Sequence, residues 1–208
     1  GLGEKVHAEM TGGEAVDVLV NNAAIVGSGV ELVEQKESDI ARTFSVNVVG
    51  ALYVIKAFLP KMIDEDRGRI VNVASAAGRS YSCCLAPYCG SKAGLIQAHH
   101  SLRLELRRRK SRVATSILLP WHVATDMFDG VTFNCIVRLV FPSLRPEFVA
   151  DRIVARASET RPVHHVDTLP WHLHWLIVVL SFLPTSLTDW ITEFAGGRDG
   201  MSSWAGRS

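Results

Sequence analysis

Short apolar runs alternate with long helical patterns along this chain, and this alternation most constrains its fold. Residues 16–21 form a β-branched run followed by a loop that contains glycine. Similar runs follow at 70–74 and 113–119. Near-continuous apolarity is typical of strands that are buried on both faces of a sheet. Between the runs, apolar residues recur at steps of three and four, which predicts helices at 38–62 and 87–109.

Strands joined by helical crossovers of this length lie parallel in one sheet, with helices packed against its faces. The chain has 208 residues, and 48% of them are hydrophobic, which is enough for the core of one domain. We therefore predict an α/β fold, a Rossmann-like doubly wound parallel sheet. A third helix is expected at 147–158, after two prolines that bracket a turn.

Polar residues follow each predicted strand, at the edge where open parallel sheets bind their ligands. Asn21 ends the first run, Ser75 follows the second, and a proline-led segment at 120–125 follows the third. The second long helix begins near Tyr88 and carries Lys92 four residues later. The candidate site is therefore expected at the carboxyl ends of the strands.

Tyr88 and Lys92 share one helix face, because residues four apart on a helix are neighbours. A free tyrosine has a pKa of ~10, and a nearby positive charge favours the phenolate. We expect Lys92 to lower the pKa of Tyr88 and so to suit it to proton transfer near neutral pH. This pair alone is also compatible with an ordinary helix contact, just as Ser75 taken singly fits a helix cap.

The combination of motifs is more specific than any one of them. Ser75 lies thirteen residues before the Tyr88-x-x-x-Lys92 pair, Asn47 lies in the preceding long helix, and an Asn-Asn-Ala-Ala motif occupies 21–24. This combination resembles the short-chain dehydrogenase/reductase family, and the resemblance covers most of the chain from residue 16 onward. Taken singly, Asn47 also fits a helix amide that bonds to backbone.

The resemblance implies an enzyme that acts on CH–OH groups with NAD or NADP. In such an enzyme Ser75 would hold and polarise the substrate oxygen, and Tyr88 would transfer the proton. Lys92 would bond the nicotinamide ribose, and Asn47 would position a water in a proton relay. The positions that match cofactor-binding residues of the family are Asn21, Ala23, Tyr88, Lys92, Val123 and Thr125. Asn21 also suits a role in tying neighbouring strands together.

Trp121 follows Pro120, where the family usually has glycine. With a bulky residue at this position, the chain resembles the branch of the family that contains retinol dehydrogenases and 17-beta-hydroxysteroid dehydrogenases. That branch implies a lipophilic alcohol or carbonyl as substrate, such as a retinoid or a steroid. Two alternatives remain open: a short-chain carbonyl or acyl reductase of another substrate class, or a catalytically inactive fragment that acts only as an interaction protein.

The glycine-rich turn that binds the pyrophosphate in such folds does not occur in this sequence. Gly27 and Gly29 follow a strand, but Leu32 stands where the third glycine would be. We therefore expect a single short-chain dehydrogenase domain over 1–208 that is incomplete at its N-terminus. Its first strand would be an exposed edge, and the fragment would neither bind dinucleotide tightly nor turn over.

The C-terminal segment 169–183 is apolar and rich in tryptophan and leucine. It is shorter than a conventional membrane span. Two readings stay open: a helix packed in the core or at a dimer interface, or contact with a membrane or lipid-droplet surface. In either case it could also form an apolar lid near the site. The expected location is cytosol-facing, in association with the endoplasmic reticulum membrane or lipid droplets, and four cysteines without a disulfide-like spacing agree with a reducing compartment. A homodimer is expected for the complete protein.

Charge and histidine content argue against two other classes of protein. The formal net charge of +1 gives no field that would gather nucleic acid, so no nucleic-acid partner is expected. Four histidines lie between residues 164 and 174, but no matching cluster of cysteines or carboxylates accompanies them. We therefore expect no metal site.

Overall fold

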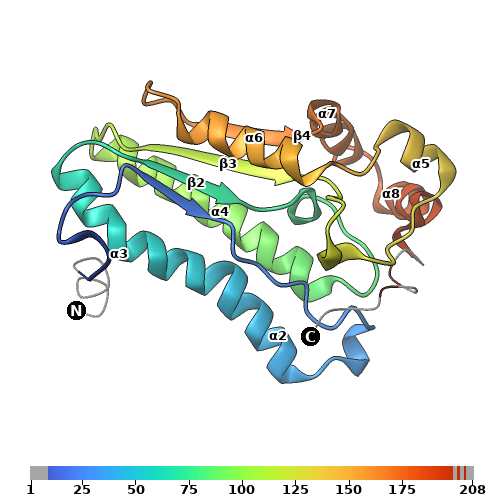
Figure 1. The fold of residues 1–208 in the computed structure, drawn as a ribbon. Helices are drawn as coiled ribbons and strands as arrows, with labels where there is room; N and C mark the ends of the chain where they lie inside the picture. The colour runs from blue at the N-terminus through green and yellow to red at the C-terminus, as the bar shows by residue number, and fades with distance from the viewer. Residues whose placement is uncertain (1–8, 199–200, 202–203, 205–208) are drawn as a thin grey trace.

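The computed structural model describes residues 9–198 together with Met201 and Trp204. At its centre is a parallel sheet of four strands in the order β1-β2-β3-β4 (Figure 1). The strands are β1 (Val18–Asn21), β2 (Arg69–Val73), β3 (Ala114–Pro120) and β4 (His165–Leu169). The predicted fold class and the three predicted strands are confirmed. Sequence reasoning missed β4, an edge strand in which His165, Asp167 and Thr168 interrupt the apolar residues.

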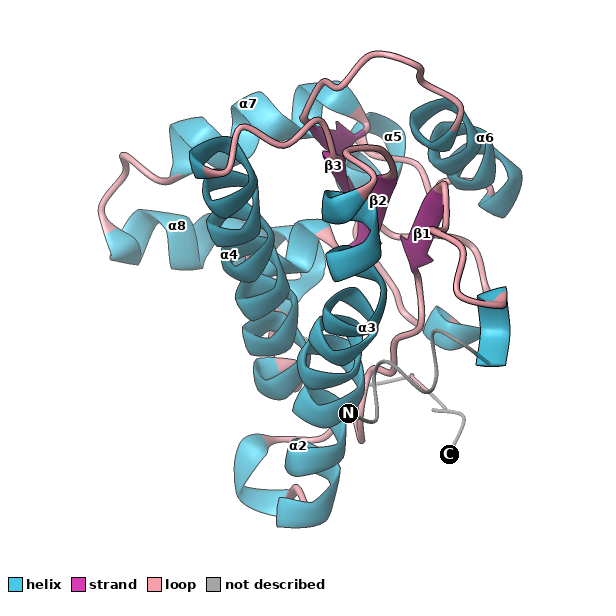
Figure 2. Cartoon of the chain, turned by 90° about the vertical axis from the view of Figure 1, so that its left-hand side faces the viewer, coloured by secondary structure: helices cyan, strands magenta, loops and turns pink. Residues whose placement is uncertain are grey.

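Helices cover both faces of the sheet (Figure 2). Along the chain they are α2 (Glu37–Phe44), α3 (Ala51–Asp64), α4 (Ala86–Arg108), α5 (Cys135–Val140), α6 (Pro146–Ala157), α7 (Trp171–Leu180) and α8 (Thr185–Thr192). A π-helical turn at Ser45–Gly50 joins α2 and α3 into one continuous helix. All three predicted helices end within two residues of the observed bounds, whereas α5 and α8 were not predicted.

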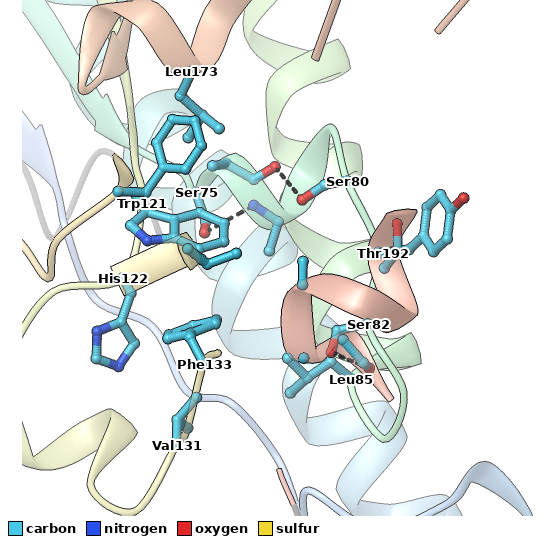
Figure 3. Close-up of a pocket in the computed structure, with 18 of the residues that line it drawn as sticks. Ser75, Ser80, Ser82, Leu85, Trp121, His122, Val131, Phe133, Leu173 and Thr192 are labelled. Carbon is cyan, nitrogen blue, oxygen red and sulfur yellow. Dashed lines mark hydrogen bonds between the residues drawn. The ribbon is translucent and has the colours of Figure 1, made fainter. Parts of the chain in front are cut away.

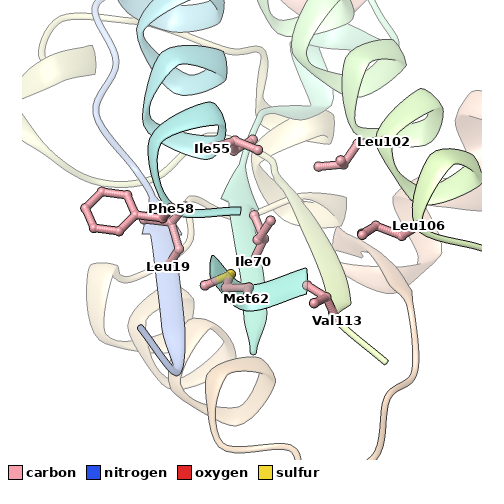
Figure 4. Packing of buried hydrophobic residues seen from close by; sticks show 8 residues of the cluster. All are labelled: Leu19, Ile55, Phe58, Met62, Ile70, Leu102, Leu106 and Val113. Carbon is pink, nitrogen blue, oxygen red and sulfur yellow. The ribbon is translucent and has the colours of Figure 1, made fainter. Parts of the chain in front are cut away.

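The hydrophobic core lies between the sheet and its helices. On one face, α3 and α4 pack against β1, β2 and β3 (Figure 4). Their shared cluster consists of Leu19, Ile55, Phe58, Met62, Ile70, Leu102, Leu106 and Val113. On the other face, α6 contributes Val149 to a second cluster with Val71, Leu118, Leu144 and Leu169. Burial on both faces explains the near-continuous apolarity of the strands.

The continuous helix Glu37–Asp64 meets the length and composition required to cross a membrane, with a mean hydropathy of 1.5 over the relevant window. Only 28% of that window is buried. The buried side chains include Ile55, Phe58 and Met62, which pack against the sheet in the main core. The C-terminal half of this helix therefore packs on one face of the sheet.

The two sides of the sheet differ in how they are held. Among the described residues β1 pairs only with β2, and Val20 on β1 is 41% exposed. The opposite edge strand, β4, is held through Arg69 at the start of β2. This side chain is buried and contacts the loop between α6 and β4. Its guanidinium donates to the backbone carbonyl oxygens of Glu159, Arg161 and Val163. This arginine ties a distant loop to the sheet.

Candidate functional site

The candidate site lies at the carboxyl ends of β1, β2 and β3, where the strand arrows of Figure 1 point. Ser75 follows β2 and caps a short 3-10 turn, Ala76–Gly78. Its Oγ accepts a hydrogen bond from the Ala77 amide at 3.1 Å and donates to the Pro120 carbonyl at 3.5 Å. Ser75 therefore does cap a helical turn, and this capping holds its hydroxyl at the site.

Gly78 allows this turn to lie directly against α4. A Cβ at position 78 would lie 2.7 Å from the backbone carbonyl carbon of Lys92 and 2.7 Å from Cδ1 of Ile96. Any side chain here would push the turn away from the helix. The close approach brings Ser75 to the first turn of α4, which carries Tyr88.

Tyr88 is buried, and its phenol hydrogen-bonds with Ser75. Burial raises the pKa of Tyr88 to about 12, although the bond with Ser75 acts in the opposite direction. The expected lowering of this pKa by Lys92 is therefore wrong for the structure as it stands, because loss of hydration dominates. At neutral pH the phenol is protonated.

Lys92 lies one turn further along α4 and is only 2% exposed. Its Nζ is 5.8 Å from the centroid of the Tyr88 ring and donates to the Val73 carbonyl at 3.2 Å. Burial lowers the pKa of Lys92 to about 8. An ammonium group has three donors, and this is the one hydrogen bond that Lys92 makes within the described residues. The remaining donors fit the hydroxyls of a ribose.

Asn47 lies in the π-helical turn and is fully buried. Its side chain accepts from the Ile25 amide at 2.8 Å and donates to the Ile25 carbonyl at 2.8 Å and to Ser91 Oγ at 2.9 Å. Ser91 in turn donates to the Tyr88 carbonyl at 2.7 Å. Asn47 thus joins the loop after β1 to the first turn of α4. Widened π turns recur at functional sites, which fits this position.

Asn21 ties two strands together, as its type and position suggested. Its amide donates to Asn72 Oδ1 at 2.9 Å, and the Asn72 amide lies 3.1 Å from Nδ1 of His99 on α4. Sequence reasoning missed Asn72 and His99. The one signal for Asn72 is that an amide interrupts an otherwise apolar strand. Ala23 is exposed in the loop that follows β1.

Val123 and Thr125 lie in the loop after β3, on the other side of Ser75 from Asn21 and Ala23. Val123 forms a parallel bridge with Leu144, in which the hydrogen-bonding backbone groups belong to His122 and Ala124. The amide of Val123 therefore faces away from that bridge. The two loops thus follow the strands on either side of β2, whose last residue Val73 accepts the Lys92 hydrogen bond, an arrangement that fits the nicotinamide end of a dinucleotide.

An apolar cavity of about 320 Å³ opens beside Ser75 and Tyr88. Figure 3 shows Trp121 close to Ser75, with Phe133, Val131 and Leu173 around the same space. Within the predicted segment 169–183, residues 171–180 form α7, and Leu173, Leu176, Ile177 and Leu180 line the cavity. Sequence reasoning missed the walls supplied by α5 and by residues 191–197, because neither stretch carries a recognisable motif.

Across the part of the chain that the structure describes, no group of three His, Cys, Asp or Glu side chains is placed to hold a metal ion. The polar groups gathered at the strand ends are instead a serine, a tyrosine, a lysine and amides. Together with a doubly wound parallel sheet, they define the class of α/β proteins that bind a dinucleotide at the carboxyl ends of the strands.

Within that class, the chain belongs to the short-chain dehydrogenase family, whose sequence model matches residues 2–134. It is 33% identical to short-chain dehydrogenase/reductase 3 of Homo sapiens, over 93% of this chain and 62% of that protein. It is 34% identical to retinol dehydrogenase 10-A of Danio rerio, over 86% of this chain and 52% of that protein. The chain thus spans about half to two thirds of the length of these relatives.

A solved structure shows the same fold. It is that of a metagenomic short-chain oxidoreductase in complex with NADP, which superimposes with a TM-score of 0.60 at 25% sequence identity. The match covers 80% of this chain and 66% of that structure. The family resemblance inferred from the motifs is therefore confirmed.

Proposed function

We propose that this protein is an NAD(P)-dependent oxidoreductase that interconverts a lipophilic alcohol, such as a retinoid or a steroid, with its carbonyl. The observation that carries the proposal is the position of Ser75 and Tyr88 in the wall of an otherwise apolar cavity. A carbonyl or carbinol oxygen placed between these hydroxyls would leave the rest of the molecule in an apolar environment.

The bound cofactor supplies a carbon centre that gives or accepts a hydride. NADP in the related solved structure supports NAD or NADP in this role. Lys92, with Asn21, Ala23, Val123 and Thr125 on the flanking loops, would hold the nicotinamide end. Ser75 would orient the substrate oxygen through its hydroxyl.

Tyr88 would be the group that moves the proton at that oxygen. In the direction of reduction, its protonated phenol donates to the developing alkoxide. In the direction of oxidation it must first release a proton, a step that burial of the phenol opposes in the protein alone. Asn47 fixes the first turn of α4 through Ser91 and so positions Tyr88.

The substrate class is inferred from the cavity. Its walls include Phe128, Phe133, Phe141, Leu173 and Ile177, and Ser75 lies beside the same space. Such a cavity favours long apolar molecules that carry a single oxygen at the reacting end. Similarity to retinol dehydrogenase 10-A supports the same class.

Two further parts of the proposal concern contact with a membrane and formation of a dimer. Exposed Trp171 and Trp175 on α7 support contact with a cytosol-facing membrane or lipid-droplet surface, from which such substrates would enter. Exposed Leu52 and Val54 on α3 and Leu104 on α4 support a dimer formed through these helices.

The test uses protein expressed from the complete gene, with NAD and NADP, against retinol, a hydroxysteroid and small polar alcohols. We expect turnover of the lipophilic alcohols, and a loss of about 10²- to 10⁴-fold in kcat for Tyr88→Phe, since proton transfer at the reacting oxygen is removed. Tyr53→Phe, at a tyrosine that is 69% exposed on α3, is the matched control and should keep normal activity.

Wild-type activity in Tyr88→Phe would contradict the catalytic role. Turnover restricted to the small polar alcohols would instead retain the mechanism and reject the lipophilic substrate class.

A further inference from the structure

Four cationic or protonatable side chains from three neighbouring segments of the fold lie near one another. We refer to Arg79, His100, Arg103 and His174 as the cationic cluster. Arg79 follows the 3-10 turn, His100 and Arg103 lie on α4, and His174 lies on α7. Arg79 Nη1 is 3.4 Å from His174 Nδ1. After burial, the charges of Arg103 and Arg79 contribute to lowering the pKa of His100, so both arginines lie near it.

The cluster contains no negative charge. Within residues 9–198, none of its four members forms an ion pair, and burial without a compensating carboxylate lowers the pKa of Arg79. Nδ1 of His100 and Nε of Arg103 are buried without a hydrogen-bond partner. So is Nε2 of the neighbouring His99, whose side chain is 1% exposed.

Such an arrangement is costly in a folded protein. Buried polar groups normally have partners, and like charges held together repel one another. An anion with several acceptor oxygens would compensate the like charges, because the two guanidinium groups can donate charge-assisted hydrogen bonds to it. A phosphate group matches this donor set in charge and in number of oxygens.

The surface next to the cluster indicates where that phosphate would come from. Trp175 follows His174 and their rings lie 5.3 Å apart, so the cluster borders the outer face of α7. That face exposes Trp171 by 72%, Trp175 by 61% and Val179 by 56%. Tryptophan beside cations is typical of segments that lie at the headgroup level of a bilayer.

We propose that the cationic cluster binds the phosphate of an anionic phospholipid in the membrane surface against which α7 lies. This inference rests on the membrane contact suggested above, but not on the oxidoreductase activity. It adds a defined headgroup site to that contact: Arg79 and Arg103 supply the charge, while His100 and His174 supply further donors. Binding there would orient the mouth of the cavity relative to the lipid.

The experiment compares co-sedimentation of the protein with phosphatidylcholine vesicles and with the same vesicles containing phosphatidic acid. We expect preference for the second, and a loss of about 30-fold in partitioning to them for the double variant Arg79→Gln/Arg103→Gln, since each arginine near an anionic surface contributes about fivefold. His174→Gln, at a single α7 side chain, should show a smaller loss in the same direction. Circular dichroism checks that each variant is folded.

The matched control removes the same charge from the far end of the same helix. Arg108→Gln/Arg109→Gln changes two exposed arginines at the C-terminus of α4 and should leave the preference intact. Equal losses of vesicle partitioning in both double variants would mean that only the overall positive charge matters. That result would overturn the proposed site.

Two other results would also reject the site. Equal binding to both kinds of vesicle would overturn the headgroup site while retaining membrane contact, whereas binding to neither would reject both. The last part of the experiment adds inorganic phosphate and follows the ring resonances of His100 and His174 by NMR. If these resonances shift while the protein shows no preference between the two kinds of vesicle, the ligand is a free phosphate and the lipid assignment is wrong.

Discussion

His99 is buried in α4 with one ring nitrogen against the Asn72 amide and the other without a partner. Burial, together with the charges of His100, Arg103 and His164, lowers its pKa from 6.5 to about 3. The folded protein therefore keeps this ring neutral at pH values where the unfolded chain protonates it. The contribution of His99 to stability is complete above pH 6.5 and is lost as the pH falls towards 3.

We expect His99→Gln to reduce the acid sensitivity of the free energy of unfolding between pH 6.5 and pH 3. The wild type should lose up to about 5 kcal/mol from this group over that range, whereas glutamine can bond Asn72 without titrating. Urea unfolding at a series of pH values measures the difference. His172→Gln on α7 is the control and should follow the wild-type profile; parallel profiles for His99→Gln and wild type would refute the assignment.

At this scale, the spacing of Ser75, Tyr88 and Lys92 was sufficient to predict that they meet at a strand end, and the structure places them together. The pKa of Tyr88 was not predictable, because spacing shows the nearby lysine but not the depth of burial. Partners such as Ser91 and Asn72 were missed for a similar reason. Their roles depend on contacts between segments far apart in sequence.

Among the helices and strands, the contact between the 3-10 turn and α4 sets the distance between Ser75 and Tyr88. Gly78→Ala should cost about 1 to 3 kcal/mol of stability, because its Cβ would meet the backbone of Lys92 and Ala93. Moving the turn should also lower kcat in the proposed reaction. Urea unfolding and steady-state kinetics test both effects.

Gly94→Ala provides the comparison on the same helix. There a Cβ would meet only methyl groups of Val48, at 3.6 Å or more, and alanine is favoured over glycine inside a helix by about 0.5 to 1 kcal/mol. This variant should be as stable as the wild type or more so. A similar response to both substitutions would show that the close approach at Gly78 has no special effect.

Secondary structure was predictable where periodicity was long and pure. The helices at 38–62 and 87–109 span many turns, so their bounds were found closely. In contrast, α5 has six residues and α8 has eight, and their amphipathic signal is short. Strand β4 was missed because His165 and Asp167 interrupt it. Both side chains face an ion-pair network with Arg156 and Glu159 that only the tertiary structure reveals.

For the molecule as a whole, Arg69 links regions that are about ninety residues apart in sequence. Arg69→Met should lower the free energy of unfolding by about 3 to 5 kcal/mol, since it leaves several carbonyls without their charged donor. Thermal and urea unfolding measure this loss. Arg67→Met is the control two residues away: its ion pairs with Asp17 and Glu65 are exposed, so we expect at most about 1 kcal/mol. Equal effects would rule out a special role for Arg69.

The residues that line the cavity come from two different stretches of the sequence. Ser75 and Tyr88 lie within residues 2–134, the part that matches the family, whereas the α7 wall and the wall at 191–197 lie beyond it. In the proposed enzyme, the reacting residues thus lie in the family-matched stretch, while part of the molecular fit is encoded in a later stretch of the polypeptide. Substitutions in the later stretch can reshape the space around a substrate while the proton-transfer geometry stays the same, so new substrate preferences can evolve without rebuilding the chemistry.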